Sequence, residues 1–300
     1  MTLTLKSTLI KFNPDTLNDV REEYNLNKPG AIAQSVNILH EWIQKQEHFV
    51  KKDFDKEYLE RFIISAKGSV EKAKTRIGKL CTMRTMAPNL QFKNNNEYVF
   101  SLQVMMPELT EDNYRILCSK MIPTKISSAI YLEICEYMKL YDYAKGYYIV
   151  IDLNDVNITD LVTNLNFSDF RNILTLMIEG YGIRIKGIYI LSTSKVINTL
   201  VKIVKLIVSA KIGERINVFK SVESLYKVLP QPLLPEDFGG EQKSILELFD
   251  EMNEELSSES HVSHMMKMKQ ACTNERLKQG DQLNEEYLGM PGSAKMLNID

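Results

Sequence analysis

The chain has 300 residues, of which 44% are apolar and 25% are charged, and its formal net charge is −2. This composition is typical of a globular protein with a sizeable core, and the length allows one large domain or two small ones. The charge gives no overall attraction to nucleic acid or to an anionic membrane, so any such attraction must come from a local patch.

Cysteine usage and the N-terminus indicate the compartment. The four cysteines are scattered without a C-x-x-C pair, which predicts neither a zinc site nor a disulfide framework. Residues 1–6 lack the apolar core of a secretory signal, and no apolar run approaches the roughly 20 residues that span a membrane. We therefore expect a cytoplasmic protein.

The first 80 residues predict an all-helical lobe. Helices are expected over residues 15–23, 32–46 and 55–66, with a further helix that begins at Ser69. The second is amphipathic, because Val36, Leu39, Trp42 and Ile43 share one face. In the following stretch, residues 98–106 fit neither the helical nor the strand period well, and we favour a helix that ends at Pro107.

From Tyr114 onward strands alternate with helices. The pattern predicts strands at residues 114–118, 147–152, 185–191 and 216–219, and helices at 127–141, from Ser168 to 179, and at 195–210. Such alternation predicts an α/β fold with a largely parallel sheet and packed helices. A helix at 245–256 precedes a polar, loosely held stretch at 257–289. The expected domains are a helical lobe at 1–90, an α/β domain at 91–245 and a polar tail at 246–300.

Four stretches resemble one known family. They are residues 60–62 with 70–73, residues 148–153, residues 184–241, which end in Leu-Pro-Glu-Asp-Phe-Gly-Gly, and residues 292–297. The chain resembles the CRAL-TRIO (Sec14-like) lipid-binding family, in particular the branch of alpha-tocopherol transfer protein, cellular retinaldehyde-binding protein and the clavesins, and its end resembles insect members. The resemblance implies a helical lobe and an α/β lobe that encloses a hydrophobic ligand cavity closed by a mobile gate helix. Such proteins carry one hydrophobic molecule between membranes and catalyse no covalent reaction.

The helix at 195–210 has two kinds of surface. Six residues at helical spacing form an apolar face: Ile197, Leu200, Val201, Val204, Ile207 and Val208. On the other side Lys202 and Lys205 lie beside Ile203 and Leu206, a pattern suited to a membrane surface. The periodicity alone favours an ordinary surface helix, whereas the resemblance favours the gate.

Basic residues flank this helix. Arg184 and Lys186 precede it, and Lys211 and Arg215 follow it. The resemblance implies that these residues, with Arg61 of the helical lobe, bind a phosphoinositide head group. Ile64 and Lys67 stand where the family has further arginines, which leaves open whether the site is retained. Taken singly, each charge also fits a solvated surface residue or an ion pair.

A cavity for an apolar ligand needs large apolar walls and few polar groups. We expect these walls to be Ile134, Tyr137, Met138, Ile149, Ile151, Phe167, Phe170, Leu174, Ile178, Ile188, Ile190, Ile197, Leu200, Val201 and Val204. Any one of them also fits a plain core position. The tyrosines between residues 131 and 147 add hydroxyl groups that could bind a polar ligand atom or a backbone carbonyl.

Motifs of enzyme chemistry are missing from the sequence. It contains no G-x-G-x-x-G, no G-x-x-x-x-G-K-[ST] and no G-x-S-x-G, and its four histidines offer few general bases. We therefore predict a non-enzymatic, monomeric carrier of a lipid such as a tocopherol or retinoid, without cofactor, metal or nucleic acid, that visits phosphoinositide membranes. A phosphoinositide-sensing adaptor is the alternative, and an α/β hydrolase or dehydrogenase is a remote one.

Overall fold

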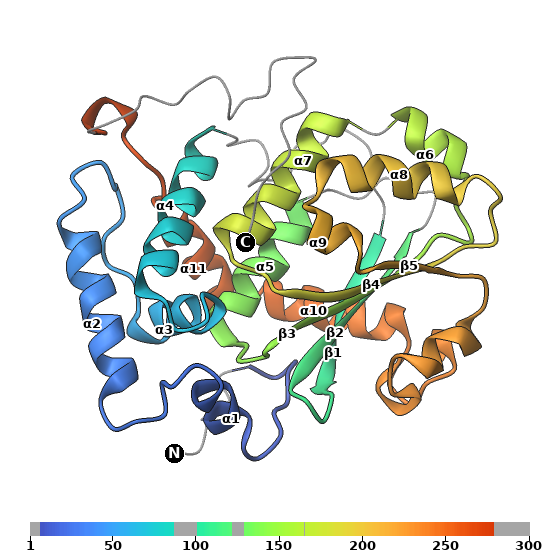
Figure 1. Ribbon diagram of the computed structural model, residues 1–300, viewed down its shortest axis with the longest axis horizontal. Coiled ribbons are helices and arrows are strands. Elements are labelled where there is room, and N and C mark those ends of the chain that lie inside the picture. The colour runs from blue at the N-terminus through green and yellow to red at the C-terminus, as the bar shows by residue number, and fades with distance from the viewer. Residues whose placement is uncertain (1–6, 87–100, 122–128, 165, 279–300) are drawn as a thin grey trace.

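The computed structural model describes residues 7–86, 101–121, 129–164 and 166–278. A lobe of four helices lies beside a five-stranded sheet whose two faces are covered by further helices (Figure 1). The helices of the first lobe are α1 (Thr16–Glu22), α2 (Ala31–Gln44), α3 (Lys56–Ser65) and α4 (Val70–Met86). The strands are β1 (Ser101–Leu109), β2 (Tyr114–Met121), β3 (Gly146–Asp152), β4 (Ile185–Leu191) and β5 (Ile216–Phe219).

The remaining helical elements connect or cover the strands. The α-helices are α5 (Ala129–Tyr141), α6 (Ile158–Asn164), α7 (Phe167–Thr175), α8 (Ile197–Ile207), α9 (Ala210–Gly213), α10 (Ile245–Leu256) and α11 (Glu259–Met268). The short π- or 3₁₀-helices are η2 (Leu176–Gly180), η3 (Val222–Lys227), η4 (Gln231–Leu233), η5 (Glu236–Phe238) and η6 (Glu275–Leu277).

The strands follow one another in chain order across the sheet, β1-β2-β3-β4-β5. β1 is antiparallel to β2, and the other three pairs are parallel. The predicted α/β fold with a helical lobe and a largely parallel sheet is therefore confirmed. Parallel neighbours need long connections, which here are α5, the α6–α7 pair and α8 with α9.

The helix predicted over residues 98–106 is wrong where the structure describes it, because Ser101–Leu109 is strand β1. Both faces of β1 are buried: Val104 and Met106 lie in the core on one side, and Met105 lies in the core on the other. A strand buried on both faces shows no alternation, so the period gave no strand signal. Pro107 is accommodated where the β1–β2 register shifts, between Met105 and Leu109.

Helix α7 starts and ends differently from the prediction. Its N-cap is Asn166 rather than Ser168, since the Asn166 side chain accepts hydrogen bonds from the backbone N–H groups of residues 168 and 169. The α-helix ends at Thr175, and the last turn before Gly180 is a π-helix. The cap therefore places Phe167 at the first helical position, where it is exposed.

The two faces of the sheet have separate cores. One face packs against α10 and residues 222–238 through a cluster that includes Val150, Tyr189 and Phe238. The turn that follows this segment requires glycine at residue 240, because a Cβ on Gly240 would lie 1.9 Å from the carbonyl oxygen of Leu234. The other face lies under α5, α7 and α8 (Figure 1). This second face carries the predicted wall residues.

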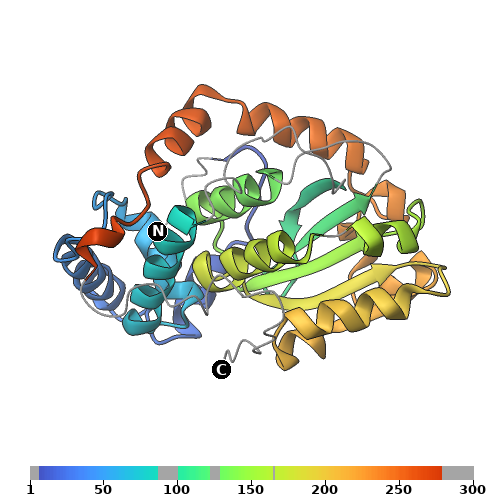
Figure 2. The same cartoon turned by 90° about the horizontal axis from the view of Figure 1, so that it is seen from above.

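The loosely held segment predicted after residue 256 is not found in its described part. Helix α11 packs on the helical lobe, and α10 and α11 together run from the sheet to that lobe (Figure 2). His264 Nε2 lies 2.8 Å from Glu136 Oε1, and the N–H of Val50 donates to the carbonyl of Cys272 over 3.1 Å. His261 is 2% exposed, and neither of its ring nitrogens has a hydrogen-bond partner among the residues that the structure describes.

The buried His261 should make stability depend on pH. Burial lowers its pKa, and the charge of His264 lowers it further, while Glu136 and Glu255 act in the opposite sense. The neutral ring is thus favoured in the folded state, so its stabilisation is complete above the ordinary histidine value of about 6.5 and is lost as the pH falls towards the lower folded pKa. Urea unfolding between pH 5 and 7 should show less slope with pH for His261→Leu.

His40→Gln is the control, because His40 is only partly buried and contacts Gln44 at the helix surface. Some slope should remain in His261→Leu, since burial also lowers the pKa of His48. An unchanged slope in His261→Leu would show that this histidine does not govern the pH dependence.

Candidate functional site

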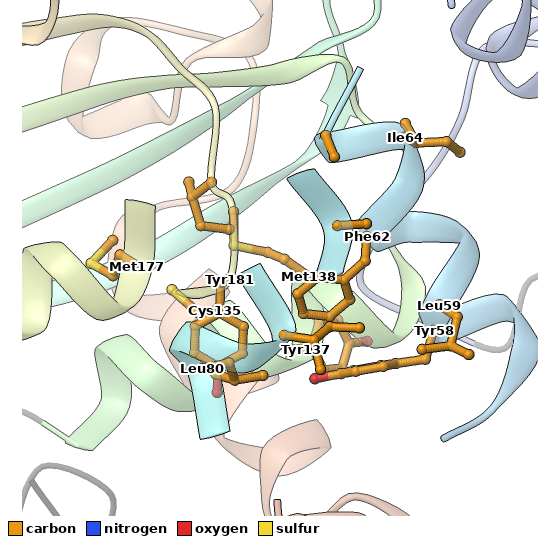
Figure 3. Close-up of a cluster of buried hydrophobic side chains, with 14 of the residues drawn as sticks. Tyr58, Leu59, Phe62, Ile64, Leu80, Cys135, Tyr137, Met138, Met177 and Tyr181 are labelled. Carbon is orange, nitrogen blue, oxygen red and sulfur yellow. The ribbon is translucent and has the colours of Figure 1, made fainter. Parts of the chain in front are cut away.

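Part of the predicted apolar wall is the core between the helical lobe and the sheet. Ile134, Tyr137 and Met138 of α5 are fully buried. Figure 3 shows Tyr137 and Met138 among Phe62, Leu59 and Tyr58 of α3, with Tyr181 and Met177 on the far side. These α5 residues therefore connect α3 to the sheet lobe, and any wall that they form is rigid.

A second group of wall residues lies between the sheet and α8. Ile190, Ile197 and Leu200 are buried there, and Ile151, Val201 and Val204 pack against them while remaining partly exposed. Ile188 of β4 borders both this cluster and the α5 core. The two groups thus share one continuous face of the sheet.

Many apolar residues of this face are not fully buried. Eight predicted wall residues are partly exposed: Ile149, Ile151, Phe170, Leu174, Ile178, Ile188, Val201 and Val204. A sheet face covered by helices normally buries its apolar side chains completely. Apolar residues of β3, β4, α7 and α8 are thus partly accessible on the same face of the sheet.

Helix α7 contributes less to this face than predicted. Ile173 and Ile178 pack against the α5 core, whereas Phe170 and Leu174 belong to none of the buried clusters. Phe167 is 43% exposed at the start of the helix. Its neighbour Asn166 caps the helix, which fixes the position of Phe167 at the surface.

The tyrosine hydroxyls are largely occupied within the protein. Tyr137 Oη lies 2.5 Å from Ser7 Oγ and 3.3 Å from Glu255 Oε1. Burial raises the pKa of Tyr147, whose hydroxyl is hydrogen-bonded to Asp142. Burial raises the pKa of the fully buried Tyr58, and the charge of Glu136 raises it further. Tyr137 and Tyr147 are therefore poor candidates for orienting a ligand.

Helix α8 has the two surfaces predicted from its sequence. Ile197 and Leu200 are buried, Lys202 and Lys205 are exposed, and Leu206 is 77% exposed. A leucine this exposed beside two lysines gives the helix an outer surface that is both apolar and basic.

Four of the five predicted basic residues lie around the junction of the lobes. Arg61 is buried under the ring of Tyr143, 4.3 Å from its centroid, and its closest ion pair is with Glu57 at 3.7 Å. Arg184 donates to Tyr24 Oη and lies 3.9 Å from Glu23. Arg215 donates to the carbonyl of Ile185, which holds the arginine near the start of β4.

Electrostatic interactions place Lys67 within the same group. Burial lowers the pKa of Lys67, and so do the charges of Arg184, Lys211, Lys72 and Arg215. Like charges therefore gather here without enough carboxylates between them. Lys186 lies elsewhere: its ammonium is 5.0 Å from the centroid of Tyr114, a ring that also packs on Tyr148.

Two cations of the junction were not singled out by sequence reasoning. Arg76 of α4 donates to Ser65 Oγ over 3.0 Å, and burial and the charge of Arg184 lower its pKa to about 10. Lys139 of α5 is 5% exposed. Burial lowers its pKa well below the usual range, and the charges of Arg76 and Arg61 add to this effect. No sequence pattern indicates that Arg76 and Lys139 share a site, because only the fold brings α4 and α5 together.

The described part of the chain provides no metal site and no membrane-spanning helix. No group of three histidine, cysteine or acidic residues there could hold a metal ion. None of the helices in it is long and apolar enough to cross a bilayer.

Comparison with known proteins gives two family matches and one similar protein. Residues 125–240 match the CRAL/TRIO domain, and residues 28–98 match the Pinta-like, UBA domain. The chain is 23% identical over 243 residues to alpha-tocopherol transfer protein-like of Mus musculus, an alignment that covers 75% of this chain and 70% of that protein. A solved structure, "Crystal structure of Sfh5", is 12% identical and covers 80% of this chain and 92% of that one, with a TM-score of 0.43.

Residues 125–240 match the CRAL/TRIO domain, and the chain is therefore similar to CRAL-TRIO proteins over this part of its length. Whether it is an insect member stays a prediction, because it depends on residues 292–297, which lie outside the described residues.

Proposed function

We propose that the protein binds a single small hydrophobic molecule between the sheet, α7 and α8, and carries it between membranes without covalent chemistry. The observation that carries this proposal is the partial exposure of apolar side chains on a sheet face that helices cover. The match to the CRAL/TRIO domain and similarity to a tocopherol-transfer-like protein support it. The binding residues are the apolar side chains of the two clusters that meet at Ile188. Helix α8 acts as the gate.

We further propose that exchange takes place at phosphoinositide-bearing membranes, with the protein cytoplasmic and only transiently bound. Arg61, Arg184, Lys211 and Arg215 surround one junction, and arginine provides the planar donor pairs that phosphate groups require. Lys186 supports this site less, because it lies against Tyr114.

The carrier proposal predicts a stoichiometric ligand. Native mass spectrometry and organic extraction of protein purified from cells should yield one hydrophobic molecule per chain. A phosphoinositide-sensing adaptor would instead bind phosphoinositide liposomes while neither carrying nor taking up an apolar molecule. That second outcome would overturn the carrier proposal in favour of the adaptor.

The head-group proposal predicts separable effects. Lys211→Ala with Arg215→Ala should weaken binding to phosphoinositide liposomes about thirtyfold, since each lysine or arginine near an anionic leaflet contributes about 1 kcal/mol. Uptake of the apolar ligand should persist, because neither residue belongs to the apolar face. Unchanged liposome sedimentation by the double variant would refute the assignment.

The gate proposal makes a prediction for Leu206. Leu206→Glu should leave the melting temperature nearly unchanged, because the residue is 77% exposed, but it should slow ligand transfer between vesicles. Leu246→Glu is the matched control: Leu246 is 58% exposed at the start of α10, which covers the other face of the sheet. Equal transfer rates in the two variants would exclude α8 as the membrane-contacting helix.

A further inference from the structure

A small cavity lies among the basic residues at the junction of the lobes. It has a volume of about 20 Å³ and is lined by α3, the end of α5 and the segments that lead into β3 and β4. Arg61, Lys139, Lys145 and Arg184 line it, together with one carboxylate, Asp142. The volume admits about one water-sized group, such as an oxygen of an anion.

Two of these five charges are already paired. The carboxylate of Asp142 accepts hydrogen bonds from Arg115 Nε at 2.7 Å and Nη2 at 3.0 Å, and neither side chain of this pair is exposed. Lys145 lies 3.3 Å from Glu23. The distances from Arg61 to Glu57 and from Arg184 to Glu23 are longer, 3.7 and 3.9 Å, so these cations are only weakly compensated.

Lys139 is the least compensated charge of the cavity. Its Nζ donates to the carbonyl of Arg61 over 3.4 Å and lies 4.9 Å from the centroid of Phe62. Neither contact provides a carboxylate to this buried side chain, although the charge of Asp142 acts to raise its pKa. Arg61 Nε is also buried and has no hydrogen-bond partner among the described residues. Two buried donors on one cavity therefore lack a full acceptor, which is costly unless a ligand supplies it.

Arg76 adds positive charge from behind the cavity wall. It reaches Ser65, which lines the cavity, and it fills the space beside Gly182, where an added Cβ would lie 2.7 Å from its Nη1. Gly182 has a φ of +68° and also lines the cavity. The wall thus brings a third guanidinium, after those of Arg61 and Arg184, close to the same space.

We propose that this cavity is a phosphate subsite in which Lys139 and Arg61 bind an oxygen of a phosphate monoester and Arg184 binds the part of the phosphate at its mouth. The subsite rests on the proposed head-group function and adds Lys139 to the binding residues. Because the phosphate supplies the negative charge that Lys139 lacks, it raises the pKa of this lysine, and binding is accompanied by the uptake of a proton.

Calorimetric titration of the full chain with inorganic phosphate, at several pH values between 7 and 10 and in two buffers of different ionisation enthalpy at each pH, tests the subsite. The wild type should take up a substantial fraction of a proton per phosphate bound. Lys139→Met, an apolar replacement of similar length, should lose the uptake and bind phosphate roughly tenfold to hundredfold more weakly. Lys145→Met should keep the uptake, because Lys145 lines the same cavity but is paired with Glu23.

The fold of Lys139→Met is checked by thermal unfolding, and its melting temperature should not fall, since the change removes a buried amine. Phosphate binding by this variant that equals the wild type, or a wild type that takes up no proton, overturns the subsite.

Sedimentation with phosphatidylinositol bisphosphate vesicles separates the two sources of phosphate. Loss of phosphate binding in Lys139→Met without any vesicle binding by the wild type would support the subsite for free phosphate and refute the head-group function.

Discussion

Buried ion pairs at the junction of the two lobes determine which charged side chains remain available to bind a ligand. Glu136 of α5 is fully buried and accepts hydrogen bonds from Arg84 at 2.7 Å and Tyr181 at 2.8 Å, and these interactions hold its pKa at about 2 despite burial. Arg115 and Asp142 form a second buried pair. Removing one partner of such a pair costs roughly 3–5 kcal/mol, because the other charge stays buried and alone. These two carboxylates are thus committed to the fold, and the guanidinium groups of Arg61 and Arg76 keep their positive charge beside the buried amine of Lys139.

The same helices carry the apolar core and these basic side chains. On α3, Arg61 precedes Phe62, and on α5, Lys139 follows Met138 (Figure 3). A close-packed interior transmits small displacements, so an anion that draws Arg61 and Lys139 together also acts on the packing of Phe62 and Met138. The proposed phosphate binding and the proposed occupation of the apolar face would therefore be connected through α3 and α5, without a requirement for contact between the two ligands.

Secondary structure was predicted correctly where the apolar residues followed one clear pattern. The strands β3, β4 and β5 and the helix α8 were predicted because β-branched runs and a regular helical stripe distinguish them, whereas β1 was missed because both of its faces are buried. Four of the five basic residues singled out in the sequence lie near the junction, and their role in binding stays a prediction. Lys186 lies against Tyr114 because the β3–β4 register shifts between Tyr147 and Tyr148, which no residue pattern reveals. Lys139 was missed because a lysine inside an apolar helix normally indicates the exposed side, and α5 is buried around it.

The chain between α8 and β5 connects the gate to the basic cluster. α8 ends at Ile207, Val208 and Ser209 are extended, and the Ser209 side chain caps α9, which contains Lys211. The proposed movement of α8 away from Ile190 can therefore pivot at residues 208 and 209 without unwinding either helix. Arg215 is held by the carbonyl of Ile185, so the far end of this segment stays attached to β4. A head group that binds Lys211 and Arg215 would thus fix one side of the pivot while Leu206 enters the membrane surface on the other side.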